Sequence, residues 1–168
     1  MNAVDRAQAE SWLHHEAALI DDYRLTEWMA LFMEDALYWL PIDENAQPGR
    51  TVALICDNSL RRRERVYRLL ETRAHAQEPA SRTIHLVSNV QVQQSAEEEA
   101  VVLSNQIIYE IRAGTADYRQ LGLGQQRSFA ARCEHRYRLQ PGGDWKIALK
   151  KMVLLNRDVA IENLTFVL

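Results

Sequence analysis

The sequence has 168 residues, of which 47% are hydrophobic and 26% are charged, and its formal net charge is −3 at pH 7. This length and composition predict one folded domain spanning residues 1–168 and exclude a disordered or fibrous chain. The small charge favours neither nucleic acid nor an anionic membrane as a partner. We find no apolar signal segment at the start and no apolar run of bilayer-spanning length, so we expect a cytoplasmic protein.

The first forty residues have the period of amphipathic helices. The apolar positions are Ala9, Trp12, Leu13, Ile20 and Tyr23 in a first group, and Leu25, Trp28, Met29 and Phe32 in a second. Each group falls on one face of a helix, and large aromatic residues on such a face usually belong to a core. We therefore predict two packed helices.

The middle of the chain predicts two short strands and a helix. The segment ALYWLPI breaks the helical period and ends near Pro41, and TVALICD follows a loop that contains QPG. Asp57, Asn58 and Ser59 are favourable N-cap residues for a helix over LRRRERVYRLLETRA, which ends before Pro79. The apolar positions of this helix are Leu60, Tyr67, Leu70 and Ala74.

From Arg82 onward the period changes to two, which predicts strands. In the first strand the alternation places Ile84, Leu86, Val90 and Val92 on one face, and His85, Asn89, Gln91 and Gln93 on the other. SAEEEA predicts a turn, and VVLSNQIIYEIRA, apolar on both faces, predicts a central strand. Alternation from Phe129 to Leu139 and the loop QPGGD predict a hairpin into WKIALKKMVLLN.

Helices that precede a run of antiparallel strands are typical of an α+β domain. The last segment, AIENLTFVL, is unusual because it ends in apolar residues, whereas a free chain end is normally polar. We expect either the domain's own sheet or a neighbouring chain to cover it.

The metal-ligating residue types do not form a complete site. Cys133 and His135 give a C-x-H, which is half of a Rieske motif, but no C-x-x-H accompanies it. His14 and His15 are adjacent on a helix and do not face the same way. We expect no metal on this chain, and we interpret Cys56 and Cys133 as reduced, buried thiols.

No motif for catalysis stands out either, since G-x-S-x-G and glycine-rich phosphate loops are missing from the sequence. One enzymatic alternative remains open. Asp35, Tyr38, His85 and His135 include an acid, a base and a hydrogen-bond donor, which an internal pocket of a conical domain could bring together. The chain would then be a free-standing isomerase or dehydratase.

The run RRRERVYR is the one strongly basic segment of the sequence. On a helix, Arg61, Arg65 and Arg68 form one stripe, and Glu64 is placed to pair with Arg68. A nucleic-acid surface would combine such a stripe with aromatic residues and a basic overall charge. We therefore interpret the stripe as solvated or subunit-facing, because arginine is favoured at protein interfaces.

Four short signatures occur in a fixed order: DALYWLPID, DNSLRRRERVYRL, EPASRTIHLVSNV and DWKIALKKMVLLN. Together they resemble the small, or β, subunit of the bacterial aromatic-ring-hydroxylating dioxygenases over nearly the whole chain. The most specific positions of the resemblance are Pro79, Ser81, Arg82, His85, Ser88, Asn89 and Val90. One departure is His75, near a position where many members carry tryptophan.

The resemblance implies a nuclear-transport-factor-like, or cystatin-like, cone in which N-terminal helices pack on a strongly curved, mostly antiparallel mixed sheet. It also implies a non-catalytic structural subunit of an oxidoreductase, with no catalytic, cofactor-binding or metal-binding residue on this chain. The Rieske [2Fe-2S] cluster and the mononuclear Fe(II) are expected on the α subunit. The implied assembly is a homotrimer of this chain that joins three α subunits in a hexamer, with no nucleic acid or membrane.

On this interpretation, a set of residues is expected at subunit interfaces. Its members are Arg61, Arg65, Arg82, His85, Asn89, Trp145, Phe166 and Leu168. Arg82, His85 and Asn89 are expected to contact a partner or to complete a hydrogen-bond network, without a role in catalysis. The aromatic substrate stays open, because the resemblance places its pocket on the other subunit.

Overall fold

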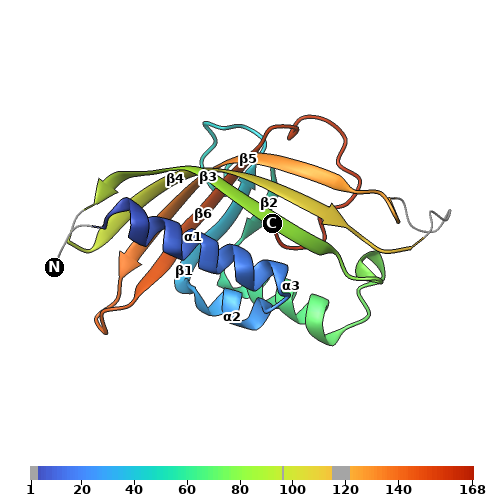
Figure 1. The fold of residues 1–168 in the computed structure, drawn as a ribbon, viewed down its shortest axis with the longest axis horizontal. Helices are drawn as coiled ribbons and strands as arrows, with labels where there is room; N and C mark the ends of the chain where they lie inside the picture. The colour runs from blue at the N-terminus through green and yellow to red at the C-terminus, as the bar shows by residue number, and fades with distance from the viewer. Residues whose placement is uncertain (1–3, 96, 115–121) are drawn as a thin grey trace.

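Three α-helices and one six-stranded sheet make up the part of the chain that the computed structural model describes, residues 4–95, 97–114 and 122–168 (Figure 1). The helices are α1 (Arg6–Asp21), α2 (Leu25–Ala30) and α3 (Ser59–Glu71), and a 3-10 turn, η1, covers His75–Gln77. The strands are β1 (Phe32–Pro41), β2 (Ala53–Asp57), β3 (Arg82–Ser95), β4 (Glu99–Ile111), β5 (Arg127–Leu139) and β6 (Trp145–Leu154).

The sheet has the strand order β2-β1-β6-β5-β4-β3. The pair β1 and β6 is parallel, and the other neighbouring pairs are antiparallel. The strands curve around α1, which packs against β3, while α2 and α3 lie beside β1 (Figure 1). This arrangement confirms the predicted α+β class, with N-terminal helices on a curved, mostly antiparallel mixed sheet.

The predicted start of the helix α3 and the later strands are confirmed. Asn58 caps α3, because its side-chain oxygen accepts a hydrogen bond of 3.0 Å from the main-chain nitrogen of Arg61. The strand β4 lies between β3 and β5, as its two apolar faces predicted. In β5 the buried side chains alternate as expected and are Phe129, Ala131, Cys133, His135 and Tyr137.

The second helix is shorter than predicted. It ends at Ala30, and Phe32 begins β1 instead of completing a helical stripe. The cause is a long-range contact: the main-chain nitrogen of Ile147 donates to the oxygen of Leu31 at 2.9 Å, and Phe32 pairs with Ile147. Pairing with β6 therefore overrides the local helical pattern.

The predicted faces of β3 are wrong in its first half. Ile84 and Leu86 are 60% and 49% exposed, whereas His85 is buried on the same side of the sheet as Val90. A β-bulge explains the exchange, because the register shifts between Ser88 and Gln91 and Asn89 adopts a positive φ of 53°. One extra residue in a strand moves every later side chain to the opposite face.

The predicted buried face of α3 is also wrong. Leu60 and Tyr67 are 60% and 62% exposed, and the helix buries Arg62, Val66 and Leu69 instead. The guanidinium of Arg62 donates hydrogen bonds to three main-chain oxygens, those of Met33, Ala36 and Asp57. These bonds orient the helix so that its arginine, and not its most apolar stripe, faces β1 and the end of β2.

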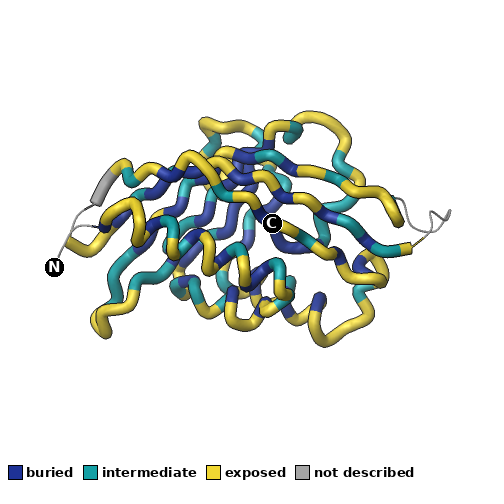
Figure 2. Tube along the Cα trace, viewed as in Figure 1, coloured by how far each residue is buried: buried dark blue, intermediate teal, exposed yellow. Residues whose placement is uncertain are grey.

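Buried positions are concentrated along the strands in the middle of the molecule, and the outward sides of the helices are exposed (Figure 2). The core combines α1 and α2 with the inner faces of the strands and the last residues of the chain. Within the described residues, no helix is both long enough and apolar enough to cross a membrane.

Candidate functional site

A cluster of charged and polar side chains lies inside the cone, between α1 and the sheet. Glu16 comes from α1, His135 from β5 and Lys150 from β6, and each of them is at most 2% exposed. Lys150 Nζ donates to Glu16 Oε1 at 2.8 Å, and Glu16 Oε2 lies 2.9 Å from His135 Nε2. Trp28 Nε1 also donates to Glu16, at 3.0 Å.

The electrostatics of this interior cluster keep Glu16 ionised. Burial alone would raise the pKa of the Glu16 carboxyl, but the charge of Lys150 and the contacts with His135 outweigh burial and hold the pKa well below its usual range. Burial raises the pKa of the neighbouring Tyr38 hydroxyl, which therefore stays neutral. The cluster is thus a compensated ion pair with hydrogen-bond partners, the arrangement that a buried charge requires.

The end of the chain closes the interior cluster. Lys150 Nζ donates to the main-chain oxygen of Leu168 at 2.7 Å, and the main-chain nitrogen of Leu168 donates to Tyr38 Oη at 3.2 Å. Phe166 and Leu168 are 2% and 0% exposed. Of the two alternatives for the apolar tail, the structure shows the domain's own fold as the cover. Phe166 and Leu168, which are predicted at a subunit interface, make these contacts within their own chain.

The four residues of the alternative acid-base pocket do not meet. Tyr38 and His135 belong to the interior cluster, but Asp35 is exposed and pairs with Arg138 at 3.2 Å. His85 lies on β3 and bonds to the last residue of α1. The cluster that does form uses Glu16 and Lys150, two residues that the sequence-based interpretation did not select for chemistry.

His85 belongs to a hydrogen-bond network that fastens α1 to β3. Its Nδ1 lies 2.6 Å from Asp21 Oδ1, and its main-chain nitrogen donates to Asp21 Oδ2 at 2.9 Å. Thr83 Oγ1 also donates to Asp21, at 2.7 Å. Burial raises the pKa of the Asp21 carboxyl, but the hydrogen bonds from His85 and Thr83 lower it by more than burial raises it. The net pKa shift of Asp21 is therefore downward. His85 therefore joins two elements of this chain.

The other interface candidates differ in their exposure. Arg61 and Arg82 are exposed, and Trp145 is half-buried with its ring 5.5 Å from that of Trp12. Arg65 is largely buried, because its Nε donates to Asp57 Oδ2 at 2.6 Å. Asn89 is exposed at the bulge and lines a groove of about 420 Å³ on the sheet.

The donor set of this chain does not fit a Rieske cluster. Cys133 is 3% exposed, and burial raises the pKa of its thiol to about 12, whereas a cluster ligand must be a thiolate. His135 already contacts Glu16 through Nε2, and Cys56 lies on β2, the edge strand. Among the described residues, no group of three or more His, Cys, Asp or Glu side chains is arranged to hold a metal ion.

The sequence does contain a signal for the interior cluster: a charged residue on a face that is otherwise apolar. Glu16 shares the buried face of α1 with Ala9, Leu13 and Ile20, and Lys150 shares the inner face of β6 with Met152. An inward charge predicts an inward partner of opposite sign. The sequence alone does not identify the partner, because the two residues are 134 positions apart.

Comparison with known structures defines the fold class first. An NTF2-like protein with a cystatin-like fold from Novosphingobium aromaticivorans is similar, with a TM-score of 0.58, 15% identity and coverage of 90% of this chain and 82% of that one. The β subunit of the benzoate 1,2-dioxygenase from Burkholderia mallei is similar with a TM-score of 0.76, 23% identity and coverage of 99% and 100%. Both likenesses show that the fold is the NTF2-like cone.

The sequence comparisons identify the family. A family model described as the ring hydroxylating beta subunit matches residues 15–160. The small oxygenase component of the p-cumate 2,3-dioxygenase system of Pseudomonas putida is 40% identical over 117 residues, which are 68% of this chain and 65% of that relative. The matched part thus spans slightly less than two thirds of the relative's length. The chain belongs to the family of ring-hydroxylating dioxygenase β subunits.

Proposed function

We propose that this chain is the non-catalytic assembly subunit of a cytoplasmic, multicomponent aromatic-ring-hydroxylating dioxygenase. The family match over residues 15–160 carries the proposal, and the names of similar β subunits support an aromatic substrate. The Rieske [2Fe-2S] cluster and the mononuclear Fe(II) then lie on a companion α subunit. In the proposed complex, three copies of this chain associate and bind three α subunits.

The state of the cone interior supports an assembly role over the alternative of a free-standing isomerase or dehydratase. Glu16 bonds to both His135 and Lys150, and the main chain of Leu168 bonds to Lys150 and Tyr38. A general acid or base must reach a substrate within hydrogen-bond distance. These groups instead contact parts of their own chain.

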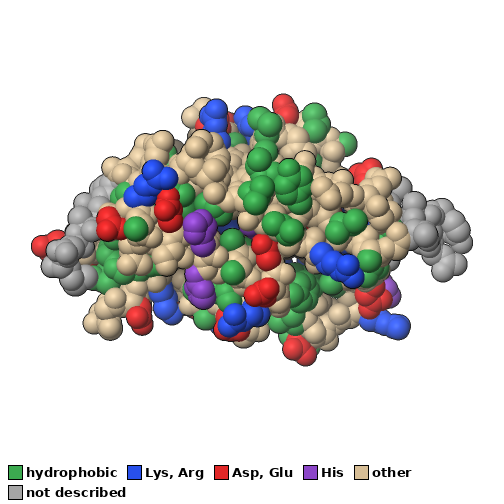
Figure 3. All heavy atoms as spheres, viewed as in Figure 1, with side chains coloured by type: hydrophobic (Ala, Val, Ile, Leu, Met, Phe, Trp, Pro, Cys, Tyr) green, Lys and Arg blue, Asp and Glu red, His purple; other side chains and the backbone are tan. Residues whose placement is uncertain are grey.

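The outward face of β3 and β4 supports self-association. Ile84 lies directly opposite Tyr109, and Leu86 lies opposite Ile107, and these four apolar side chains are 38% to 60% exposed. One of the four, Ile107, also lines a second groove of about 450 Å³ together with Leu155. In Figure 3, hydrophobic side chains gather in the upper centre of the view, above α1. Contiguous exposed apolar surface of this kind is typical of interaction sites.

We assign this surface, called the open sheet face and defined by Ile84, Leu86, Ile107 and Tyr109, to contacts between copies of the chain. Four of the predicted interface residues, Arg61, Arg82, Asn89 and Trp145, are exposed or half-buried and stay candidates for subunit contacts. Arg65 and His85 are held by Asp57 and Asp21, so their proposed part is to support the surfaces around them.

The experiment measures the mass of the purified chain by light scattering. We expect three times the 19.4 kDa of one chain, and no colour, bound iron or turnover without the α subunit. Replacing both Leu86 and Ile107 with lysine is expected to give monomers that keep the far-ultraviolet circular dichroism of the folded chain. Val52→Lys is the matched control, because Val52 is 76% exposed in a loop away from this face.

Two results would contradict the proposal. A trimer that survives both lysine substitutions would exclude the open sheet face as the contact. Iron bound by this chain alone, or a reaction that it performs unaccompanied, would exclude the assembly role itself.

A further inference from the structure

Residues 163–168 bind to the domain without belonging to the sheet, and the last three of them are buried inside the cone. Asn163–Leu168 has no helix or strand, yet Phe166, Val167 and Leu168 are at most 3% exposed. The end of the drawn chain lies near the centre of the molecule (Figure 1). We call residues 163–168 the tail segment.

The interior end of the tail segment is bound by side chains whose positions are set by other contacts. Tyr38 Oη accepts from the main-chain nitrogen of Leu168 at 3.2 Å, and Lys150 Nζ donates to the main-chain oxygen at 2.7 Å. Lys150 is fixed by Glu16, which is itself held by Trp28 and His135. The groups that receive Leu168 are therefore ordered by contacts that do not include the tail segment.

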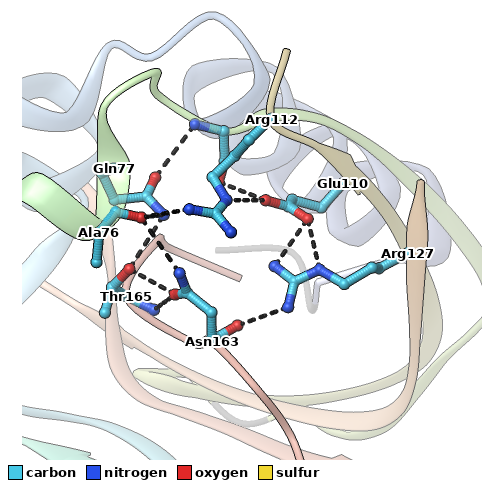
Figure 4. Close-up of polar contacts among 8 residues, drawn as sticks. Ala76, Gln77, Glu110, Arg112, Arg127, Asn163 and Thr165 are labelled. Carbon is cyan, nitrogen blue, oxygen red and sulfur yellow. Dashed lines mark hydrogen bonds and ion pairs between the residues drawn. The ribbon is translucent and has the colours of Figure 1, made fainter. Parts of the chain in front are cut away.

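A second group of side chains holds the start of the tail segment (Figure 4). Arg127 Nη1 donates to the main-chain oxygen of Asn163 at 3.1 Å, and Gln77 Nε2 donates to Thr165 Oγ1 at 3.0 Å. Asn163 Nδ2 donates to the main-chain oxygen of Ala76 at 3.2 Å. Arg127 is oriented by Glu110, at 2.8 Å, so this group too is built from the body of the domain.

Between the two polar ends, the contact is made by the Phe166 ring. The Phe166 ring lies 5.7 Å from that of Phe129 on β5, with 59° between the ring planes. The guanidinium of Arg127 lies 5.9 Å from the centre of the Phe166 ring. Hydrogen bonds to the main chain, combined with a pocket for a side chain, are one way in which proteins bind short peptides.

The connection to β6 resembles a tether. Asp158, Val159 and Ala160 are exposed, and Val159 is 61% exposed. A tether of this kind keeps the effective concentration of a bound segment high without adding contacts of its own.

We propose that the interior of the cone is a peptide-binding site, and that the tail segment is its ligand, bound in cis. The ligand class is a short peptide with two polar residues, one aromatic anchor and two aliphatic residues after it. The site recognises the main chain of the second aliphatic residue, Leu168, through Lys150 and Tyr38. This inference concerns the chain itself and is independent of its assembly with other subunits.

The experiment separates the tail segment from the body after folding. The exposed residues 158–160 are replaced with a site-specific protease sequence, and the purified chain is then cleaved. We expect the cleaved fragment to co-elute with the body in gel filtration, and a labelled synthetic peptide of residues 162–168 to exchange with it. Fluorescence anisotropy measures the affinity of the peptide for the body.

Variants test whether the described contacts carry this affinity. Tyr38→Phe is expected to weaken peptide binding about fivefold or more, because it removes the hydroxyl that bonds to Leu168. Tyr67→Phe is the matched control, because Tyr67 is 62% exposed on α3 and its loss of a hydroxyl should leave the affinity unchanged. A peptide that carries the change Phe166→Asp should not bind measurably.

Two results would overturn the inference. One is unfolding of the body when the fragment leaves, which would make the tail segment an inseparable part of the core. The other comes from hydrogen exchange of the intact chain, which can be measured even if the protease sequence prevents folding. The amides of Val167 and Leu168 should exchange with solvent faster than those of Leu149 and Met152 in β6. Equal exchange rates would contradict a separable ligand.

Discussion

At the scale of residues, the fold depends on ions that are buried together. Glu16 and Lys150 are each at most 2% exposed, and neither is stable inside the cone without the other. Arg62 follows the same rule with main-chain oxygens as partners. These side chains connect elements that are distant in sequence, so they specify how α1 and α3 lie on the sheet.

The first prediction concerns the pH dependence of stability. Glu16→Gln should lower the free energy of unfolding by about 3 to 5 kcal/mol at pH 7, because Lys150 loses its charged partner. The folded-state pKa of Glu16 is depressed, so its contribution is fully present above the unfolded pKa of about 4.3 and is lost as the pH falls toward the folded value. The gap between wild type and variant should therefore narrow below about pH 5.

Urea unfolding at several pH values between 7 and 3 measures this gap. Glu10→Gln is the matched control on the same helix, because Glu10 is on the surface and pairs with Arg6. Parallel stability curves for wild type and Glu16→Gln would show that folding does not shift the pKa of Glu16, which would contradict the prediction.

At the scale of elements, one residue sets which side chains of β3 face the core. Asn89 has φ 53°, a left-handed conformation that asparagine and glycine tolerate better than β-branched residues do. The bulge lets His85 and Val90 both point inward, although an unbroken strand would separate them. The open sheet face exists because Ile84 and Leu86 are turned outward by the same bulge.

The second prediction follows from this bulge. Asn89→Val should destabilise the chain by about 1 to 2 kcal/mol, whereas Asn89→Gly should change its stability by only a few tenths of a kcal/mol. Gln91→Val, at an exposed position of the same strand, is the control and should be nearly neutral. Denaturant unfolding of the three variants measures these changes in the free energy of unfolding. An equal loss of stability in Asn89→Val and Gln91→Val would contradict the prediction.

Elements with a strict period could be predicted from the sequence, and those shaped by distant partners could not. The alternation from Phe129 to Tyr137 and the capping side chain of Asn58 are local signals, and both are confirmed. Phe32 fits a helical pattern in the sequence, but it pairs with Ile147, which lies more than a hundred positions away. On α3 the hydrophobic pattern favours Leu60 as a buried residue, whereas the structure buries Arg62.

The same limit applies to the candidate site. The family signatures identified the class of protein, but they did not indicate where the tail segment lies. Its apolar end predicted a cover, and only the structure distinguishes the inside of the domain from a neighbouring chain. The partners of Glu16 and His85 likewise come from other elements, and a single sequence contains no signal that pairs them.

At the scale of the whole molecule, stability should be highest in the middle of the sheet. The strands β4, β5 and β6 each have a paired strand on both sides, whereas β2 and β3 form the two edges. Main-chain amides that are paired in buried strands open only with the global unfolding of a domain. The loop between β1 and β2 has few such bonds.

The third prediction concerns hydrogen exchange measured by mass spectrometry on the whole chain. Peptides from β4 and β5 should be the most protected, and peptides covering residues 43–52 the least. Exchange in concentrated urea supplies the reference rates for the unfolded chain. Greater protection in β2 than in β5 would contradict the strand order described here.

The parallel pairing of β1 with β6 also determines when the molecule can become complete during synthesis. The first two strands are joined to the other four only through β6, which ends at Leu154. A nascent polypeptide on the ribosome therefore carries unpaired strand edges at least until β6 has been translated. Early helices and hairpins can form before that point, but the open edges of β1 and β5 need protection from aggregation until β6 pairs with both.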